Sequence, residues 1–154
     1  MSFVFDTLVR EEGVRLDPYR DHRGFWTIGI GHLIDRRKGG SLPSWVRPSF
    51  PITREEADEM CRADIAAFQT GLAAGIPWWS RTTDTVRAVL TLMAFQMGVE
   101  GVLKFRVTLA AIERGDWDTA ADQMLRSLWA DQTPDRARRM VDLLRSGVPS
   151  GEGA

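Results

Sequence analysis

The chain has 154 residues, of which 44% are hydrophobic and 27% charged, a composition typical of an ordinary globular protein. Its 20 basic and 21 acidic side chains give a formal net charge of -1, which excludes the strong positive field that recruits nucleic acid. A single cysteine, Cys61, excludes an internal disulfide and a cysteine-rich metal site, and we expect no metal or cofactor. No stretch approaches the roughly 20 apolar residues of a membrane span, so we expect no stable membrane association.

The first segment predicts a helix that ends near Gly13. Phe5, Leu8 and Val9 recur at helical spacing, and a glycine just past the last helical residue is a common C-cap. Glu12 therefore falls in the last turn of this helix. The segment has no basic stretch followed by a long apolar run, so we expect no signal peptide and accumulation in the cytoplasm.

Aromatic and β-branched residues then predict a β-hairpin. Tyr19 and residues 25–30 flank the turn signal Asp-His-Arg-Gly at 21–24, which places Asp21 in the turn. Alternation puts Thr27 on the same face as its neighbours two residues away, and glycines at 29 and 31 commonly mark the close approach of a ligand or backbone. Residues 35–51, rich in Gly, Pro and Ser, are expected to be the loop-rich remainder of a small sheet.

Thr53 and Glu56 form a capping box that predicts a helix to about Ala74. Such a helix is about 33 Å long, enough to join two lobes. After residue 82 the chain predicts helices only, over 83–97, near Val102, and over 107–114, 116–129 and 134–144. Asp116 and Thr133 are the predicted caps of the last two.

The expected fold is α+β, with a small β lobe and a larger helical lobe joined by a long helix, and a ligand crevice between the lobes. The predicted boundaries are about 14–52 for the β lobe, 53–74 for the connecting helix, 1–13 with 75–147 for the helical lobe, and 148–154 for a flexible tail.

Glu12 and Asp21 are the candidate acid and base of a glycoside hydrolase. Cleavage of a glycosidic bond by water needs one protonated carboxyl group for the leaving oxygen and one carboxylate for the water. The C-terminal end of a helix carries partial negative charge, which favours a protonated Glu12, whereas Asp21 lies near free backbone N–H groups that favour its ionised form. The hydroxyl of Thr27 suits the binding of a water molecule, as an inverting mechanism requires.

These residues also carry a resemblance to phage lysozymes of the T-even type. The resemblance runs through Glu12-Gly13, Tyr19, Asp21, Gly24 and the words TIGIGH and FQMG, and continues to QTP at 132–134. It covers nearly the whole chain, from about residue 3 to 147. It implies a lysozyme-like fold with Glu12 as general acid, and Asp21 and Thr27 positioning the attacking water.

The resemblance implies further site residues. Those expected to contact substrate are Leu33, Phe95, Gln96, Thr108 and Gln123. In addition, His32 is expected to pair with Asp64, and Arg136 is expected to approach Glu12. These last three residues are interpreted as structural support.

The chain departs from the family pattern in places. The stretch between His32 and Ile52 is several residues shorter, so the outer sugar subsites are not inferred from the family. Leu128 stands where the pattern suggests arginine, which removes a contact to the peptide part of the substrate. Trp78 and Trp79 are more simply explained by packing than by stacking on sugars.

The predicted function is that of an endolysin muramidase. It would hydrolyse the β-1,4 bond between N-acetylmuramic acid and N-acetylglucosamine in peptidoglycan, with inversion, and lyse the host cell. We expect a monomer that needs a holin to leave the host cytoplasm and reach periplasmic peptidoglycan. The alternatives are a lytic transglycosylase, a catalytically silent peptidoglycan-binding protein, and a lysozyme domain delivered by a phage tail or secretion system.

Overall fold

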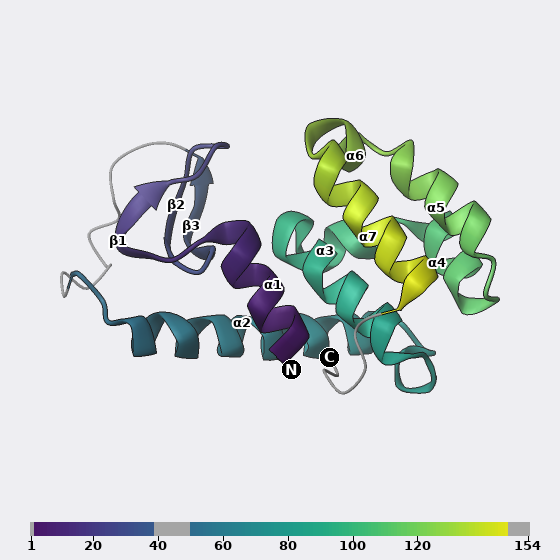
Figure 1. Cartoon of the computed structure of the whole chain (residues 1–154), viewed down its shortest axis with the longest axis horizontal. Coiled ribbons are helices and arrows are strands. Elements are labelled where there is room, and N and C mark those ends of the chain that lie inside the picture. Colours follow the sequence, from purple (N-terminus) through teal and green to yellow (C-terminus); the bar gives the residue numbers. More distant parts are fainter. Residues whose placement is uncertain (1, 39–49, 148–154) are drawn as a thin grey trace. The chain divides into compact units, whose positions relative to one another are not determined.

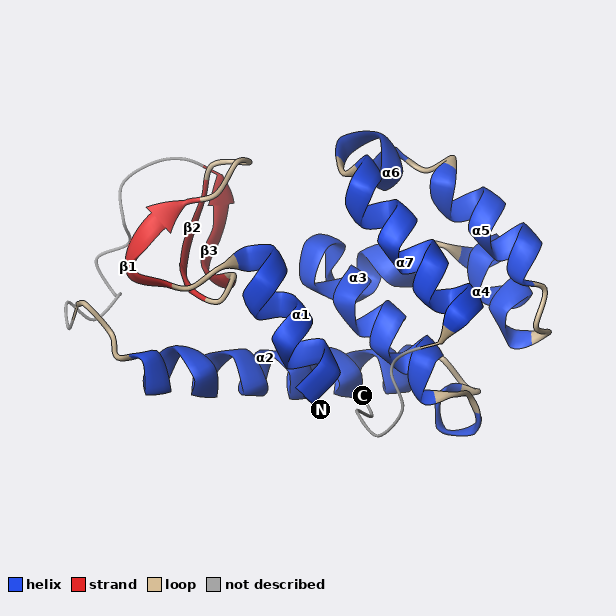
Figure 2. Ribbon diagram, in the orientation of Figure 1, coloured by secondary structure: helices blue, strands red, loops and turns tan. Residues whose placement is uncertain are grey.

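A computed structural model describes residues 2–38 and 50–147, and they form helices with one small sheet (Figure 1). The elements, in chain order, are α1 (Ser2–Glu12), β1 (Arg15–Arg20), β2 (Phe25–Gly29), β3 (His32–Lys38), α2 (Arg54–Gly75), η1 (Trp79–Arg81), α3 (Asp84–Leu103), α4 (Arg106–Glu113), α5 (Trp117–Leu125), α6 (Leu128–Gln132) and α7 (Pro134–Ser146). This confirms the predicted α+β class, and Figure 2 shows how the helices outnumber the strands.

The chain divides into two compact units. The N-terminal unit is Phe5–Ala66, and the C-terminal unit is Met1–Val4 with Ala67–Ala154. Both divisions fall inside helices, α1 and α2, so the lobe boundaries expected from the sequence stay a prediction. The expected flexible tail lies outside the described residues, as does most of the loop after β3.

The N-terminal unit begins as predicted. Gly13, with φ of +72°, ends α1, and its N–H donates to the carbonyl of Val9 at 2.9 Å. The sheet that follows is antiparallel in the order β1-β2-β3, and residues 21–24 form the turn between its first two strands. Residues 35–38, expected in the loop-rich remainder of the sheet, form the end of β3, which pairs with β2 as far as the pair Phe25–Lys38.

Helix α2 starts at the predicted capping box. The Thr53 hydroxyl accepts from the N–H of Glu56, and the Glu56 carboxylate accepts from the N–H of Thr53, both at 3.0 Å. Cys61 on this helix is fully buried, as expected for a small apolar side chain. The helix ends at Gly75, one residue past the predicted end near Ala74, and the indole of Trp78 beyond it is buried, which confirms a packing role.

Helix α3 forms the core of the C-terminal unit. It packs on α7, which also contacts α5 and α6. The chain leaves helical geometry at Gly98 (φ 76°, ψ 164°), which confirms the predicted break before the short piece at Val102. By length and composition α3 could cross a membrane, so the expectation that no stretch approaches a span is too strong, but half of the relevant window is buried in the fold.

Two predictions in this unit are wrong. The helix expected over 116–129 is divided into α5 and α6, because Ser127 is extended (φ -77°, ψ 159°) and its hydroxyl caps a new helix by accepting from the N–H of Ala130. Thr133 occupies the predicted N-cap position and Pro134 begins α7 as predicted, but the Thr133 hydroxyl donates to the carbonyl of Trp129 at 2.9 Å and makes no capping hydrogen bond. The predicted cap at Asp116 is confirmed by a 3.1 Å bond from the N–H of Thr119.

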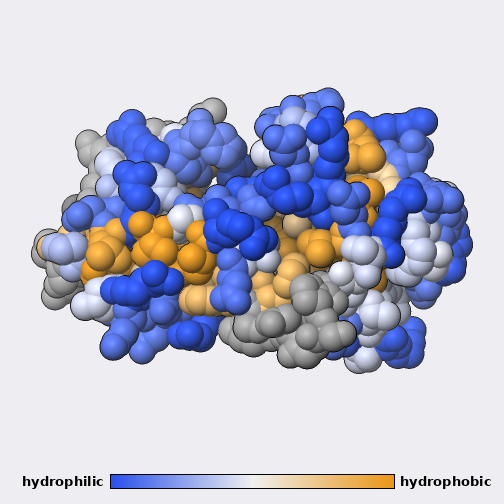
Figure 3. All heavy atoms as spheres, viewed as in Figure 1, coloured by the Kyte–Doolittle hydropathy of each residue, from blue (hydrophilic) through white to orange (hydrophobic). Residues whose placement is uncertain are grey.

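The surface alternates between polar and apolar side chains. Figure 3 shows hydrophilic residues over most of the visible face, with hydrophobic residues reaching the surface in patches between them. The most exposed large apolar side chains of the described residues are Leu128 and Val107, at 71% and 56%. Isolated apolar side chains of this kind are common on soluble folds and need no special role.

Candidate active site

Glu12 lies against the backbone of the turn between β2 and β3. A Cβ built on Gly31 would lie 3.0 Å from its Cγ and 3.2 Å from its Cδ, so any larger residue here would push this carboxyl group aside by a few tenths of an ångström. Gly31 also has φ of +64°, a conformation that favours glycine. The sequence predicted the close approach of a ligand or another backbone at this glycine, and the group that lies there is the side chain of Glu12. The helix end and the strand turn together fix the position of Glu12.

Asp21 organises the turn in which it lies. Its Oδ1 accepts from the backbone N–H groups of Arg23 and Phe25, both at 2.9 Å. Its own N–H donates to the carbonyl of Phe25, and its carbonyl accepts from Gly24, again at 2.9 Å. Both side-chain bonds end on one oxygen, so no hydrogen bond found among the described residues uses Oδ2. A carboxylate held in this way has a fixed orientation, and its second oxygen can accept hydrogen bonds from other partners.

Thr27 is the middle member of a row across the sheet. It pairs with Tyr19 on β1 and with Leu33 on β3, and residues directly opposite in a sheet place their side chains on the same face. Thr27 is 4% exposed and its hydroxyl donates to the carbonyl of Phe25 at 3.0 Å. Because the hydroxyl donates to the backbone, its lone pairs can accept a hydrogen bond from water.

Tyr19 was not predicted as a site residue. The pKa of its phenol is raised because burial disfavours the charged form, because Glu12 and Asp21 are negative, and despite the lowering effect of Arg15. The phenol therefore lies within electrostatic reach of both candidate catalytic carboxylates. The signal that sequence reasoning missed is the pairing of Tyr19 with Thr27, which depends on the register between β1 and β2.

His32 and Asp64 form the predicted pair. Nδ1 of His32 lies 2.8 Å from Oδ2 of Asp64, and the two side chains are 33% and 22% exposed. The contact joins β3 to the part of α2 that belongs to the N-terminal unit. It therefore supports the sheet, while His22, beside Asp21, is exposed as expected.

Two predicted substrate residues of the C-terminal unit take part in packing. The ring of Phe95 contacts that of Phe68, with centroids 4.7 Å apart. The Gln96 carbonyl oxygen accepts from the indole N–H of Trp129 at 2.8 Å, which leaves its NH2 group for other contacts. Their roles toward substrate stay predictions.

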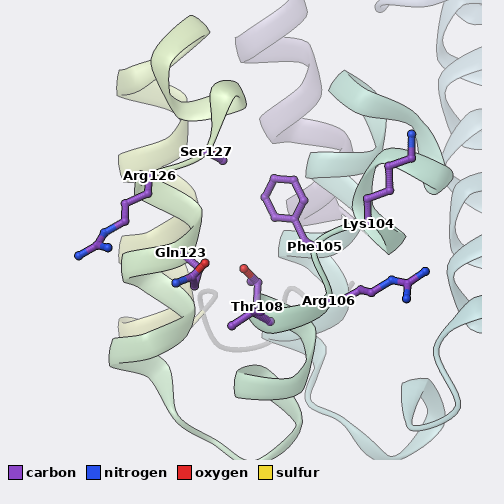
Figure 4. Close-up of a pocket in the computed structure, with 8 residues that line it drawn as sticks. Lys104, Phe105, Arg106, Thr108, Gln123, Arg126 and Ser127 are labelled. Carbon is purple, nitrogen blue, oxygen red and sulfur yellow. The ribbon is translucent and has the colours of Figure 1, made fainter.

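Thr108 and Gln123 line one open pocket of about 280 Å³. Figure 4 shows the two side chains facing each other from α4 and α5, with the ring of Phe105 beside them. The charged ends of Lys104, Arg106 and Arg126 flank this pocket but point away from it. The structure thus brings together two residues that the sequence connected only through a family resemblance. Their roles toward substrate stay predictions.

The remaining predictions concern Arg136 and metal binding. Arg136 belongs to the C-terminal unit and Glu12 to the N-terminal unit, so their pairing stays a prediction. Within residues 2–38 and 50–147, no group of three or more His, Cys, Asp or Glu side chains could hold a metal ion.

Comparison with known sequences decides the family. The sequence model described as phage lysozyme matches residues 9–141, a range that includes every candidate site residue described above. The chain belongs to the phage lysozyme family. It is a glycoside hydrolase of the lysozyme type that acts on peptidoglycan.

Relatives of this lysozyme come from different settings. It is 32% identical to probable T4-type lysozyme 1 of Dictyostelium discoideum, over 96% of both chains. It is 36% identical to the pre-baseplate central spike protein Gp5 of Enterobacteria phage T4, over 92% of this chain and 27% of that protein. It is 29% identical to the endolysin of Salmonella phage P22, over 83% of this chain and 82% of that protein.

Proposed function

We propose that this lysozyme cleaves the β-1,4 bond between N-acetylmuramic acid and N-acetylglucosamine with inversion, using Glu12 as general acid and Asp21 with Thr27 to place the water. The observation that carries the proposal is the arrangement of these groups in one compact unit. Glu12 is fixed against Gly31, and Asp21 is fixed by its turn. Thr27 lies in β2, the strand that connects the turn of Asp21 to the turn of Gly31.

The hydrogen-bonding capacity of Asp21 and Thr27 supports the water's role. The Thr27 hydroxyl donates to the Phe25 carbonyl, so toward water it acts as an acceptor. A water molecule that donates one hydrogen to Thr27 and the other to the Asp21 carboxylate presents a lone pair to the sugar. As the new C–O bond forms, its proton passes to Asp21, while Glu12 gives its proton to the leaving oxygen.

The C-terminal unit supplies the proposed substrate contacts. Thr108 and Gln123 face each other across an open pocket, where we propose that their hydroxyl and amide contact the polar groups of a sugar or its peptide. Phe95 and Gln96 are further proposed contacts of this unit, and Leu33 is a proposed contact of the N-terminal unit. Leu33 is 41% exposed, so its side chain is accessible to a ligand.

The variant Glu12→Gln tests the acid. We expect the release of reducing ends from purified peptidoglycan to fall at least about 100-fold, the contribution typical of general acid catalysis. Glu59→Gln, the same chemical change at an exposed position of α2, is the control and should retain activity. Retained activity in Glu12→Gln, with an unchanged circular dichroism spectrum, would remove Glu12 from this role.

Thr27→Val tests the water site, since it keeps the shape of the side chain and removes the hydroxyl. We expect slower turnover with little change in binding. The anomer of the first product then distinguishes the mechanisms: an α product supports inversion, and a β product contradicts it. A lytic transglycosylase, which uses no water, would instead release an anhydro-sugar that is lighter by one water.

We also propose that the biological role is release of phage from its host. The protein would collect in the host cytoplasm as a monomer and reach the periplasmic peptidoglycan through a holin. The likeness to the P22 endolysin supports this role. The likeness to the T4 spike protein favours a second candidate, in which the same chemistry belongs to a phage particle. Detection of the chain in purified particles would favour the second role, and detection only in lysing cells the first.

A further inference from the structure

Tyr19 completes a row of side chains of which two members already belong to the proposed site. The register pairs Tyr19 with Thr27 and Thr27 with Leu33, so all three side chains lie on the same face of the sheet. Thr27 is the proposed water ligand and Leu33 a proposed substrate contact. Tyr19 is also two residues before Asp21 on the same strand and turn.

The hydroxyl of Tyr19 is not used by the fold. The side chain is half-buried, and no hydrogen bond found in the described part of the chain involves its oxygen. A phenol can donate one hydrogen bond and accept others, so a hydroxyl that no other protein group uses is available to a bound ligand. A hydroxyl in this condition beside two catalytic carboxylates is suited to a bound ligand.

The charges around Tyr19 determine which kind of hydrogen bond it offers. Burial and the negative charges of Glu12 and Asp21 raise the pKa of the phenol, more than Arg15 lowers it. A phenol is protonated at neutral pH even at its ordinary pKa, and the raised pKa keeps it so; the group therefore presents an O–H donor. The glycan strand of peptidoglycan offers acceptors for this donor in its hydroxyl, ether and acetamide oxygens.

The ring of Tyr19 is held in place before any ligand binds. The guanidinium of Arg15 lies 4.3 Å from the ring centroid, a cation–π contact within a single strand. A side chain that is already oriented loses less conformational freedom on binding. The contact also leaves the hydroxyl edge of the ring to other partners.

We propose that Tyr19 is a further substrate-binding residue, whose O–H donates a hydrogen bond to an oxygen of the sugar bound beside Glu12 and Asp21. This inference rests on the proposed function, because it uses the same site. It adds a specific donor on the strand opposite Thr27.

The composition of the chain provides a direct probe. Tyr19 is its only tyrosine, so protein made with tyrosine labelled at the ring carbon that carries the hydroxyl gives a single NMR signal. The probe ligand is the tetrasaccharide of alternating N-acetylglucosamine and N-acetylmuramic acid, added to Glu12→Gln protein to prevent turnover. We expect the signal to shift until the protein is saturated, and a signal that stays constant through saturation overturns the proposal.

The variant Tyr19→Phe removes only the oxygen. Loss of one hydrogen bond made in both the ground and transition states should raise KM about three- to tenfold and leave kcat within about twofold. Arg20→Gln, next on β1 and on the opposite face, is the control and should retain the KM of the wild type. A merely structural role for Tyr19 would lower the melting temperature without this change in KM.

The outcomes distinguish a failure of the Tyr19 proposal from a failure of the proposed function. Wild-type protein that releases reducing ends, with equal KM and kcat in Tyr19→Phe, overturns the role of Tyr19 alone. A fall in kcat at constant KM also overturns it, since the hydroxyl would then act in the reaction step. Wild-type protein that releases no reducing ends overturns the proposed function, and the NMR titration still reports whether the hydroxyl meets the glycan. If Tyr19→Phe fails to fold, the same titration decides the proposal.

Discussion

Replacing Gly31 by alanine adds one methyl group beside Glu12, and we expect the change to lower turnover about tenfold. The new Cβ would lie 3.0 Å from Cγ, 3.2 Å from Cδ and 3.3 Å from Cβ of Glu12, where ordinary contact begins at 3.4 Å. The carboxyl group must therefore move by a few tenths of an ångström. A misplacement of about 1 Å costs about 100-fold in rate, so a shift of up to half that size costs about tenfold.

The same substitution carries a cost in stability. Gly31 has φ of +64°, and a residue with a Cβ pays about 1–2 kcal/mol in this left-handed region. Gly115 provides a matched control, because its φ is +74° and a Cβ there would meet nothing within 4 Å. Both alanine variants should lose similar free energy of unfolding, but only Gly31→Ala should lose activity.

Urea unfolding followed by circular dichroism measures the stability, and the release of reducing ends from purified peptidoglycan measures the activity. Wild-type turnover in Gly31→Ala would show that contact with this backbone does not position Glu12. An equal loss of activity in Gly115→Ala would show that the effect comes from general destabilisation. Either result would refute the reasoning.

Three further expectations follow from single contacts. Thr53→Ala removes the hydroxyl that accepts from the N–H of Glu56 at 3.0 Å and should cost about 1 kcal/mol in urea unfolding, so an unchanged midpoint would contradict the cap. Gln96→Leu leaves the buried indole N–H of Trp129 without its acceptor and should cost about 1–3 kcal/mol, whereas a neutral result would mean that another group or water replaces it. Burial raises the pKa of the Cys61 thiol from 9.0 to about 12, so Ellman's reagent at pH 8 should react only after unfolding. Because the unfolded thiol ionises first, the free energy of unfolding should fall as pH rises from about 9 towards 12. Rapid labelling of the native protein by Ellman's reagent would contradict the raised pKa of the thiol.

The sequence predicted the elements whose signals are local. The end of α1 at Gly13, the hairpin turn at Asp21 and the capping box of α2 each depend on a few adjacent residues. The boundary between α5 and α6 was missed because the helical periodicity continues through Ser127, whose hydroxyl caps a new helix instead. The capping tendency of one serine thus competes with a pattern spread over many residues.

The candidate site residues also divide into those with local sequence signals and those whose positions depend on distant parts of the chain. Glu12, Asp21 and Thr27 came from short-range patterns, and the glycine at 31 correctly marked a close approach. Tyr19 was missed, because its place beside Thr27 depends on strand register, which a bulge between β1 and β2 shifts. The facing positions of Thr108 and Gln123 depend on the packing of two helices, for which the sequence offered only its family likeness.

The turn contacts of Asp21, beside its proposed catalytic role, have a practical consequence for mutagenesis. Because one of its oxygens anchors the N–H groups of Arg23 and Phe25, an alanine at this position deletes a scaffold as well as a charge. Inactivity in such a variant cannot be credited to lost proton transfer alone. Asparagine preserves the anchoring oxygen and removes only the charge. The difference in activity between the two variants therefore separates the contribution of the turn's structure from that of the carboxylate's charge.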